Sequence, residues 1–211
     1  MSKNLKRVFL FAALATLALA LVIVGQGLAQ TTGTVQELGE FLYFDENLSE
    51  PAGQACASCH EPGFGFVDPD KGQPVSEGVI PGLFGTRNSP AAAYAMYAPI
   101  RYFDEGEGLW VGGQFWDSRA TGEELGDPLA DQALGPFTNP VEMANPDRRT
   151  VIRDVALSSY KDLYEEIWPL TDLDTWETMT DLEIDVAYEQ VALSIAAFER
   201  TGLFGQFSSK Y

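Results

Sequence analysis

Histidine and cysteine are scarce in this sequence of 211 residues, which contains one histidine and two cysteines. A single histidine excludes any metal centre that is held by two imidazoles. Structural zinc sites need four ligands, and the chain has only three residues of the type that dominates such sites. Internal repeats and low-complexity tracts are also absent, so the sequence does not indicate a solenoid or a fibrous protein.

Positive charge is the second scarcity, with 13 Lys and Arg against 31 Asp and Glu. Lys3, Lys6 and Arg7 cluster at the N-terminus, which leaves 10 basic and 31 acidic residues, or −21, in the remainder. So acidic a chain argues against nucleic acid and anionic membrane surfaces as partners. It would attract a basic protein, although the same charge can equally serve only to keep a protein soluble.

The first 29 residues resemble an export signal. Three basic residues precede an almost unbroken apolar run from Val8 to Gly25, and Gly27-Leu28-Ala29 offers small residues for cleavage before Gln30. We therefore expect residues 1–29 to be a signal peptide and residues 30–211 to form a single domain. Because the apolar run is long, an uncleaved membrane anchor is the alternative. In both cases the rest of the chain is exported.

Both cysteines and the histidine fall in one stretch, Cys56-Ala57-Ser58-Cys59-His60. CxxCH is the attachment pattern of c-type haem, in which two thiols form thioethers and the adjacent imidazole ligates iron. The sequence therefore predicts one covalent haem c on Cys56 and Cys59, with His60 as the proximal ligand. A redox CxxC pair or a simple disulfide is the alternative. Since haem c is attached on the exported side of the bacterial membrane, motif and signal together predict a periplasmic protein.

The absence of a second histidine has a consequence for the other face of the iron. That face must be open or held by a weaker ligand, and an open iron can do chemistry. The candidate weaker ligands are the methionines Met96, Met143 and Met179, although methionine more often fills a core.

Helix signals recur along the chain and predict an all-α, cytochrome c-like haem domain with long irregular loops. Apolar spacing indicates a first helix at Val35–Leu42. Start signals then predict helices at 90–97 after Ser89, from Asp127-Pro128 to Gly135, and at 146–157 after Asn145-Pro146. The residues between these helices, 61–88 and 98–119, are expected to be loops.

The last helix has the clearest signals. Thr180 and Glu183 form a capping box at its start, and Gly202 is expected to end it. Its apolar stripe is expected to face the core, and consists of Ile184, Tyr188, Val191, Ile195 and Phe198.

Several segments together resemble the bacterial di-haem cytochrome c peroxidase family, in matching order over nearly all of residues 30–211. The segments are the haem motif, Leu38–Asp45, Leu48-Ser49, Arg87–Pro90, Phe115–Ala120, Asp131–Pro136, Asn139–Met143 and Ala197–Thr201. The resemblance implies the fold of that family's N-terminal domain, whose haem reacts with peroxide. Family members carry a second haem domain, which would begin near Tyr211. The sequence is thus a fragment, one part of a split gene or a single-haem relative, and a second haem subunit or domain is an expected partner.

The resemblance also implies roles for individual residues. Gln132 and Glu142 correspond to polar residues of the peroxide pocket, Trp116 to a tryptophan between the haems, and Asn88 to a calcium ligand. From its charge alone, Arg119 could pair with a haem propionate or with any nearby acid. Each of the implied roles has a simpler alternative: a solvated carboxylate for Glu142, a surface position for Gln132 and core packing for Trp116.

The expected activity is the reduction of H2O2 to water with electrons from a small, basic redox protein, either a cytochrome c or a cupredoxin. Glu142 suits the proton transfer because burial raises a carboxyl pKa toward neutrality. Gln132 can orient peroxide, and Trp116 can hold or pass an electron hole. One alternative is a mono-haem electron carrier without peroxidase activity. Another is oxidation of a partner protein's side chains through Trp116.

Overall fold

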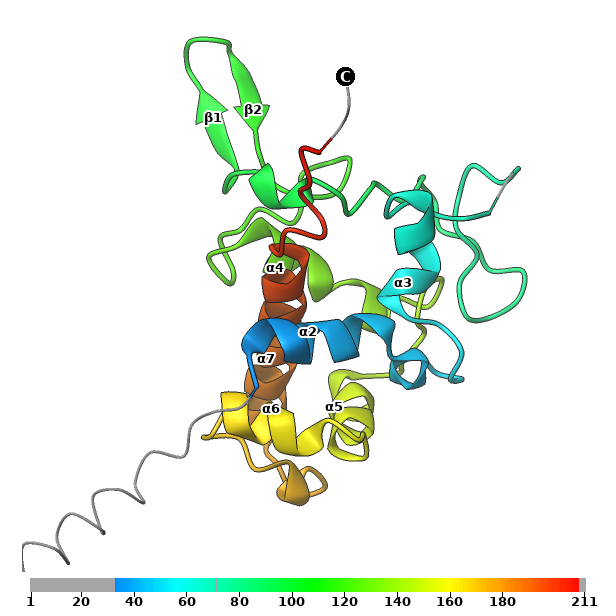
Figure 1. The fold of residues 1–211 in the computed structure, drawn as a ribbon, viewed down its shortest axis with the longest axis vertical. Coiled ribbons are helices and arrows are strands. Elements are labelled where there is room, and N and C mark those ends of the chain that lie inside the picture. The colour runs from blue at the N-terminus through cyan, green and yellow to red at the C-terminus, as the bar shows by residue number, and fades with distance from the viewer. Residues whose placement is uncertain (1–32, 71, 209–211) are drawn as a thin grey trace, which may run out of the picture. The chain divides into compact units, whose positions relative to one another are not determined.

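The computed structural model describes residues 33–208 apart from residue 71, so the expected signal peptide at 1–29 lies outside the described residues. This part of the chain contains six α-helices, short 3₁₀ turns and one β-hairpin, whose arrangement can be followed in Figure 1. None of these helices combines the length and the apolar character needed to cross a membrane. The elements in chain order are α2 Val35–Phe44, α3 Cys56–Cys59, β1 Tyr102–Asp104, β2 Leu109–Val111, α4 Pro128–Ala133, α5 Arg148–Ala156, α6 Lys161–Ile167 and α7 Asp181–Glu199.

Helix α7 is the central element, and α2, α4 and α5 all pack against it. The predicted capping box is present, since Thr180 accepts from the Glu183 amide while Glu183 accepts from the Thr180 amide at 2.7 Å. The predicted stripe is also confirmed, because all five of its residues are buried. The helix ends at Glu199, three residues before the glycine that was expected to stop it. Its burial on several sides explains why the other helices are arranged around it.

Helix α2 crosses α7 at very short range (Figure 1). The contact needs a glycine, because a Cβ on Gly39 would lie 1.9 Å from the Ser194 carbonyl oxygen. At the end of α2, Tyr43 packs edge-on against Phe198 and Phe204, with ring centroids 5.4 and 5.6 Å away. The helix predicted at Val35–Leu42 is therefore confirmed, and its buried face holds the aromatic cluster of the core.

The helix predicted to begin at Asp127-Pro128 is confirmed, whereas the predicted start at Asn145 is wrong. Asp127 caps α4 by accepting from the Leu129 amide. Helix α5 begins two residues later than expected because Asp147, not Asn145, caps it. The Asn145 side chain is buried and donates instead to the carbonyl oxygens of Leu48 and Phe137, at 2.7 and 2.9 Å. Its amide therefore serves long-range packing rather than helix initiation.

The helix predicted at 90–97 is also wrong, since only a single 3₁₀ turn at Ala95–Tyr97 forms there. Tyr94 has a left-handed backbone, with φ of 64°, and this interrupts any helix through it. The Ala92 amide donates to the Phe66 carbonyl oxygen, a contact that replaces a helical hydrogen bond. Ser89 approaches the haem motif, with its hydroxyl 3.5 Å from the Cys59 carbonyl oxygen. Tertiary contacts thus override the local start signal.

The described residues are mostly helical, as predicted, but the expectation of an all-α fold needs one correction. Strands β1 and β2 form an antiparallel hairpin inside the predicted loop 98–119, with Phe103 opposite Trp110. The turn is closed by Asp104, whose carboxylate accepts from the Gly106 and Glu107 amides. Strands of three residues are too short to leave an alternating pattern in the sequence. Helix α6 was also missed, and the cytochrome c-like arrangement stays a prediction.

The Gly39 contact can be tested by adding a single methyl group. Gly39→Ala should lower the free energy of unfolding by about 1–3 kcal/mol, because α2 must move away from α7 to accept the Cβ. A change of this size lowers Tm by roughly 2–4 °C for each kcal/mol. Glu40→Ala, on the exposed side of the same helix, is the control and should change Tm little. Equal melting temperatures for the two variants would contradict the close approach.

Candidate functional site

The haem motif lines a cavity of about 330 Å³ that contains most of the residues singled out in the sequence. Its walls come from α3, α4 and α7 and from the loops that precede and follow the hairpin. The cavity-lining residues that matter below are Gln54, Cys56, Cys59, His60, Ser76, Asn88, Trp116, Arg119, Gln132, Glu142, Met143 and Glu199.

Helix α3 is a single turn that carries both cysteines three residues apart. His60 follows as its C-cap, and its amide donates to the Cys56 carbonyl oxygen at 3.0 Å. Tyr43 holds the same turn from α2, because its hydroxyl donates to the His60 carbonyl oxygen at 2.9 Å. The two thiols and the imidazole therefore face one cavity from a fixed turn, as thioether attachment and axial ligation require.

Burial determines the protonation state of these groups. It raises the pKa of both the Cys56 and Cys59 thiols, so neither is an activated thiolate of the kind found in redox CxxC pairs. It lowers the pKa of His60, which favours the neutral imidazole that binds iron. Ser89 is the nearest side-chain partner of the ring, with its hydroxyl 3.4 Å from Nε2.

The alternatives to haem find no support in the described residues. Cys56 and Cys59 are free thiols rather than a disulfide. Among residues 33–208, residue 71 aside, no three His, Cys, Asp or Glu side chains come together as a metal-binding group. The arrangement therefore fits the attachment of a haem better than a zinc site or a structural disulfide.

Two buried polar atoms in the cavity wall have no hydrogen-bond partner: Gln54 Oε1 and Glu199 Oε2. Such atoms are rare in folded proteins and cost free energy unless a ligand or water satisfies them. Their gathering around the thiols and the imidazole indicates a wall shaped for a bound group with some polar surface. The residues present thus fit a covalently attached haem, held by Cys56, Cys59 and His60.

Glu142 lies in this cavity on a loop that is fixed from both sides. Its amide donates to the Asn139 carbonyl oxygen, and its carbonyl accepts from the Val79 amide at 2.8 Å. Gly78 permits this approach, since a Cβ there would lie 2.4 Å from the Val141 carbonyl oxygen. Burial raises the pKa of Glu142, and this effect outweighs the opposing influence of Arg119. Glu142 is thus half-buried in the cavity wall.

Gln132 and Trp116 also line the cavity, in different settings. Gln132 projects from α4 and is half-buried. Trp116 is 66% exposed and its indole donates to the Asn88 carbonyl oxygen at 2.7 Å, which makes core packing of Trp116 wrong. The cavity thus combines a carboxyl, an amide and a solvent-exposed indole, and their catalytic roles stay predictions.

Arg119 and Asn88 both line the cavity and bond to protein groups there, Arg119 to a nearby acid as one of the two expectations had it. Arg119 pairs with Asp117 at 2.9 Å and stacks on Phe115, with its guanidinium carbon 3.6 Å from the ring centroid. The Asn88 amide nitrogen donates to the Pro74 carbonyl oxygen at 3.1 Å. Pairing of Arg119 with a propionate and binding of calcium at Asn88 both stay predictions.

Of the three candidate methionine ligands, Met143 lines the cavity. Met96 and Met179 are not among the lining residues; Met96 packs beside Leu129 and Ala196, and Met179 is buried where its carbonyl accepts from Arg149. The structure therefore leaves Met143 as the methionine to test.

Gln54, Ser76 and Glu199 were not predicted as site residues. Glu199 did leave a signal, because it follows Ile195 by four residues and so continues the apolar face of α7 as a carboxylate. It is only 5% exposed, and burial together with nearby Asp127 raises its pKa to about 8. Gln54 and Ser76 lie in loops and left no pattern in the sequence.

Comparison with known proteins identifies the family to which this chain is similar. The family model described as di-haem cytochrome c peroxidase matches residues 34–211. The chain is 38% identical over 203 residues to methylamine utilization protein MauG of Paracoccus denitrificans, covering 92% of this chain and 48% of that protein. It is 30% identical over 166 residues to cytochrome c551 peroxidase of Pseudomonas aeruginosa, covering 79% of this chain and 38% of that one.

The solved structures agree. The crystal structure of the diheme peroxidase BthA from Burkholderia thailandensis superposes with a TM-score of 0.68 at 28% identity, over 83% of this chain and 40% of that one. The chain thus spans less than half the length of each of these relatives. A match over residues 34–211, together with a CxxCH turn facing a buried cavity, places the chain in the di-haem cytochrome c peroxidase family.

Proposed function

We propose that this chain is the peroxide-reacting haem domain of an exported c-type haem peroxidase, which reduces H2O2 to water with electrons from a small redox protein. The observation that carries the proposal is the shared cavity: Glu142, a half-buried carboxyl with a raised pKa, lines the same space as the haem motif. The family's peroxidases support the same reaction class. The segment 1–29, with its signal-like sequence, supports export to the periplasm.

The haem bound to Cys56, Cys59 and His60 would supply the electron-transfer chemistry of the reaction. The protein's part is the movement of protons, since reduction of H2O2 takes up two electrons and two protons and yields two waters. Glu142 can take a proton from one peroxide oxygen and return it to the other, which leaves as water. The Gln132 amide can hold peroxide in place and donate a hydrogen bond to the developing charge.

The surroundings of Glu142 suit this role. A carboxyl that exchanges protons near neutral pH needs a pKa above its ordinary value, and burial provides this. The positive charge of Arg119 acts in the opposite direction and lowers the pKa of Glu142. The loop contacts to Asn139 and Val79 hold the backbone of Glu142 still, so that the proton donor and acceptor positions are defined.

A second candidate function rests on the exposure of Trp116. An indole that is 66% exposed and also lines the cavity could pass an electron hole to the surface. Peroxide would then be reduced with two electrons taken from the side chains of a docked partner protein. Trp116→Phe separates the two functions: it should abolish oxidation of a protein substrate while the reduction of H2O2 by a small chemical reductant continues.

The attachment of haem is the first prediction. Protein made in a host that matures c-type cytochromes should gain the mass of one haem, because one CxxCH turn is present. Cys56→Ala and Cys59→Ala together should abolish the covalent mass gain. Intact-protein mass spectrometry with a haem stain of a denaturing gel decides the point. An unmodified mass for the parent chain would contradict the assignment.

The second prediction concerns the state of the iron. We expect a high-spin ferric signal in electron paramagnetic resonance, because the chain offers no second histidine opposite His60. Met143→Leu should leave this signal unchanged. A low-spin parent that becomes high-spin in Met143→Leu would instead identify Met143 as the sixth ligand and favour an electron carrier.

The third prediction concerns proton transfer. Glu142→Gln keeps the side-chain shape and removes the titratable group, so the rate of the peroxide reaction should fall by roughly 10²–10⁴-fold. In the parent this rate should fall as the pH drops below the raised pKa of Glu142, because only the ionised form can accept a proton. In Glu142→Gln this pH dependence should vanish. Stopped-flow mixing with H2O2 measures both effects.

Two matched variants complete this test. Glu77 lines the same cavity but is exposed, so Glu77→Gln should react at the parental rate. Gln132→Ala removes orientation only and should cost less than Glu142→Gln. If Glu142→Gln reacts as fast as the parent with its ferric spectrum intact, the proton-transfer role is wrong.

A further inference from the structure

The carboxyl of Glu199 is not used by the proton transfer assigned to Glu142, although it lies in the wall of the same cavity. Glu199 is the last residue of α7 and is only 5% exposed. Its Oε2 atom is buried without a hydrogen-bond partner. A polar atom in that state costs free energy, so it indicates that a water or a ligand meets it there.

The groups around Glu199 favour its neutral form. Burial raises its pKa to about 8, with a further contribution from Asp127 at the start of α4, whereas Arg200 acts in the opposite direction. Arg200 is engaged with Asp127, because its Nε donates to the Asp127 carboxylate at 2.9 Å. From α2 and α3, Tyr43 and Cys56 also interact with Glu199, and neither is a cation. At neutral pH the Glu199 carboxyl therefore offers both a donor and an acceptor.

Glu199 also borders a second, much smaller space. This small pocket has a volume of about 30 Å³ and is lined by His60, Pro90, Ala91, Ala92, Ala95, Gln114, Phe115, Leu129, Gln132 and Glu199. A cavity of roughly 10–15 Å³ already holds one water molecule if a few polar groups meet it. Glu199, Gln132 and Gln114 supply such groups. The small pocket therefore has the size and the lining of a site for a bound water.

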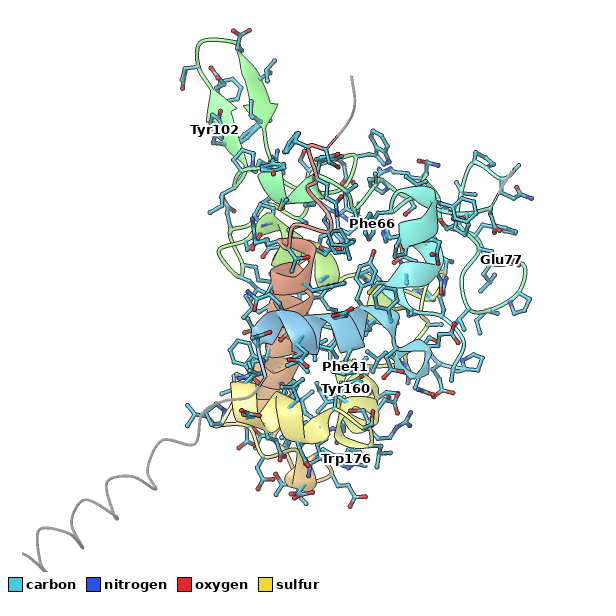
Figure 2. All side chains as sticks on the ribbon, in the orientation of Figure 1. Phe41, Phe66, Glu77, Tyr102, Tyr160 and Trp176 are labelled. Atoms are coloured by element: carbon cyan, nitrogen blue, oxygen red, sulfur yellow. The ribbon has the colours of Figure 1, made fainter. Side chains whose placement is uncertain are left out.

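Packing on two sides fixes the frame of the small pocket. Helix α4 packs beside the end of α7 (Figure 1), where Leu129 and Ala196 belong to one apolar cluster. On the other side, the Ala92 amide donates to the Phe66 carbonyl oxygen at 3.0 Å. The Phe66 ring, labelled in Figure 2, packs against Phe204 with ring centroids 4.1 Å apart. The two helices that carry the polar groups are therefore held at a fixed separation.

Gln132 stands at the junction of the two spaces, since it lines both the small pocket and the cavity of the haem motif. Its side chain has no hydrogen bond to any other residue that the structure describes. Gln114, by contrast, is fixed because its amide nitrogen donates to the Ala95 carbonyl oxygen at 2.7 Å. A long side chain without partners has several rotamers open to it, so Gln132 needs a further contact to present its amide in one orientation.

We propose that Glu199 is a positioning residue for Gln132. One water bound in the small pocket joins Glu199 Oε2 to the Gln132 amide, and this bridge holds Gln132 in the orientation in which it meets peroxide. The proposal rests on the function proposed above, in which Gln132 orients the substrate. Glu199 acts through Gln132 and does not itself touch peroxide.

The test uses the full haem-loaded chain and two readouts. The first is the dissociation constant of fluoride, an anion that binds ferric haem and accepts hydrogen bonds, measured from visible absorption spectra. The second is the rate of the reaction with H2O2 in stopped flow. Both are measured for the parent, for Gln132→Ala, for Glu199→Met, for these two combined and for Glu199→Gln.

Ser194→Ala is the matched control on the same helix. The Ser194 hydroxyl is as deeply buried in α7, but it accepts from the Trp168 indole at 3.1 Å and donates to the Gln190 carbonyl oxygen at 2.7 Å. Neither Trp168 nor Gln190 lines the cavity of the haem motif or the small pocket. This variant should lower Tm while both readouts keep their parental values.

Gln132→Ala should weaken fluoride binding and slow the peroxide reaction by about tenfold or more, because a hydrogen bond to a charged ligand is lost. Glu199→Met should cost about 3–10-fold in both readouts, because Gln132 keeps its amide but loses its orientation. In the Gln132→Ala background, Glu199→Met should cause no further loss. Glu199→Gln should stay close to the parent, because its amide also donates and accepts.

Other outcomes overturn the proposal. Additive losses from Gln132→Ala and Glu199→Met would mean that the two residues act separately. If Glu199→Gln is as impaired as Glu199→Met, the effect belongs to the carboxyl itself rather than to a hydrogen bond. An equal loss in Ser194→Ala would assign it to a general loosening of α7.

The same measurements separate this inference from the proposed function. If Glu142→Gln and Gln132→Ala are both impaired while the Glu199 variants match the parent, the positioning role is wrong and the proposed function stands. If Glu142→Gln and Gln132→Ala both match the parent, the proposed function fails and the positioning role fails with it.

Discussion

The close crossing of α2 over α7 is the contact on which the rest of the structure depends. Gly39 lets the two backbones meet at a distance that no other residue permits. That contact fixes the end of α2, where Tyr43 packs on Phe198 and donates to the His60 carbonyl oxygen. A shift of α2 would therefore move His60 itself, so the packing of two helices determines the position of the haem motif.

Helix α7 also positions residues in the other wall of the cavity. Its Tyr188 hydroxyl donates to the Leu134 carbonyl oxygen at 2.6 Å, which holds the C-terminal end of α4 and with it Gln132. Its last residue, Glu199, contributes a buried carboxyl to the cavity. One buried helix thus positions residues that come from widely separated parts of the chain, and the site is only as rigid as the packing around α7.

Burial explains the chemistry of the cavity as well as its shape. Burial raises the pKa of the half-buried Glu142 and of the fully buried Glu199, and Gln54 leaves a polar atom unpaired in the same wall. A protein that had only to be stable would avoid such groups, because each costs free energy. Their concentration in one place is the mark of a site that receives a polar group and handles protons.

Carboxyl groups in the cavity and carboxyl groups at the surface have different environments. In the cavity, burial raises the pKa of Glu142 and Glu199, whereas many of the acidic side chains elsewhere in the described residues are exposed. The exposed aromatic rings of Phe41 and Phe44 lie among these acidic side chains.

Features that lie within one short segment of the chain could be predicted from the sequence. The Cys56–His60 motif is one turn of chain, the Thr180–Glu183 capping box spans three residues, and the stripe of α7 repeats with the helical period; all three are found in the structure. Gln132 and Glu142 could be assigned to one cavity only by resemblance to the family, because the residues next to each of them in the sequence give no sign that the two share a site. The sequence therefore determined the haem chemistry and the central helix.

The tertiary structure decided what depends on contacts between distant segments. Ser89 and Asn145 look like helix caps, yet Ser89 turns toward the haem motif and Asn145 bonds across 97 residues to Leu48, so neither starts a helix. The three-residue strands of the hairpin are too short for a pattern. The exposure of Trp116 and the burial of Glu142 and Glu199 are likewise invisible in the sequence, because solvent access is set by which remote segments cover a side chain. Residue types determine which chemistry is available, and packing determines where it can act.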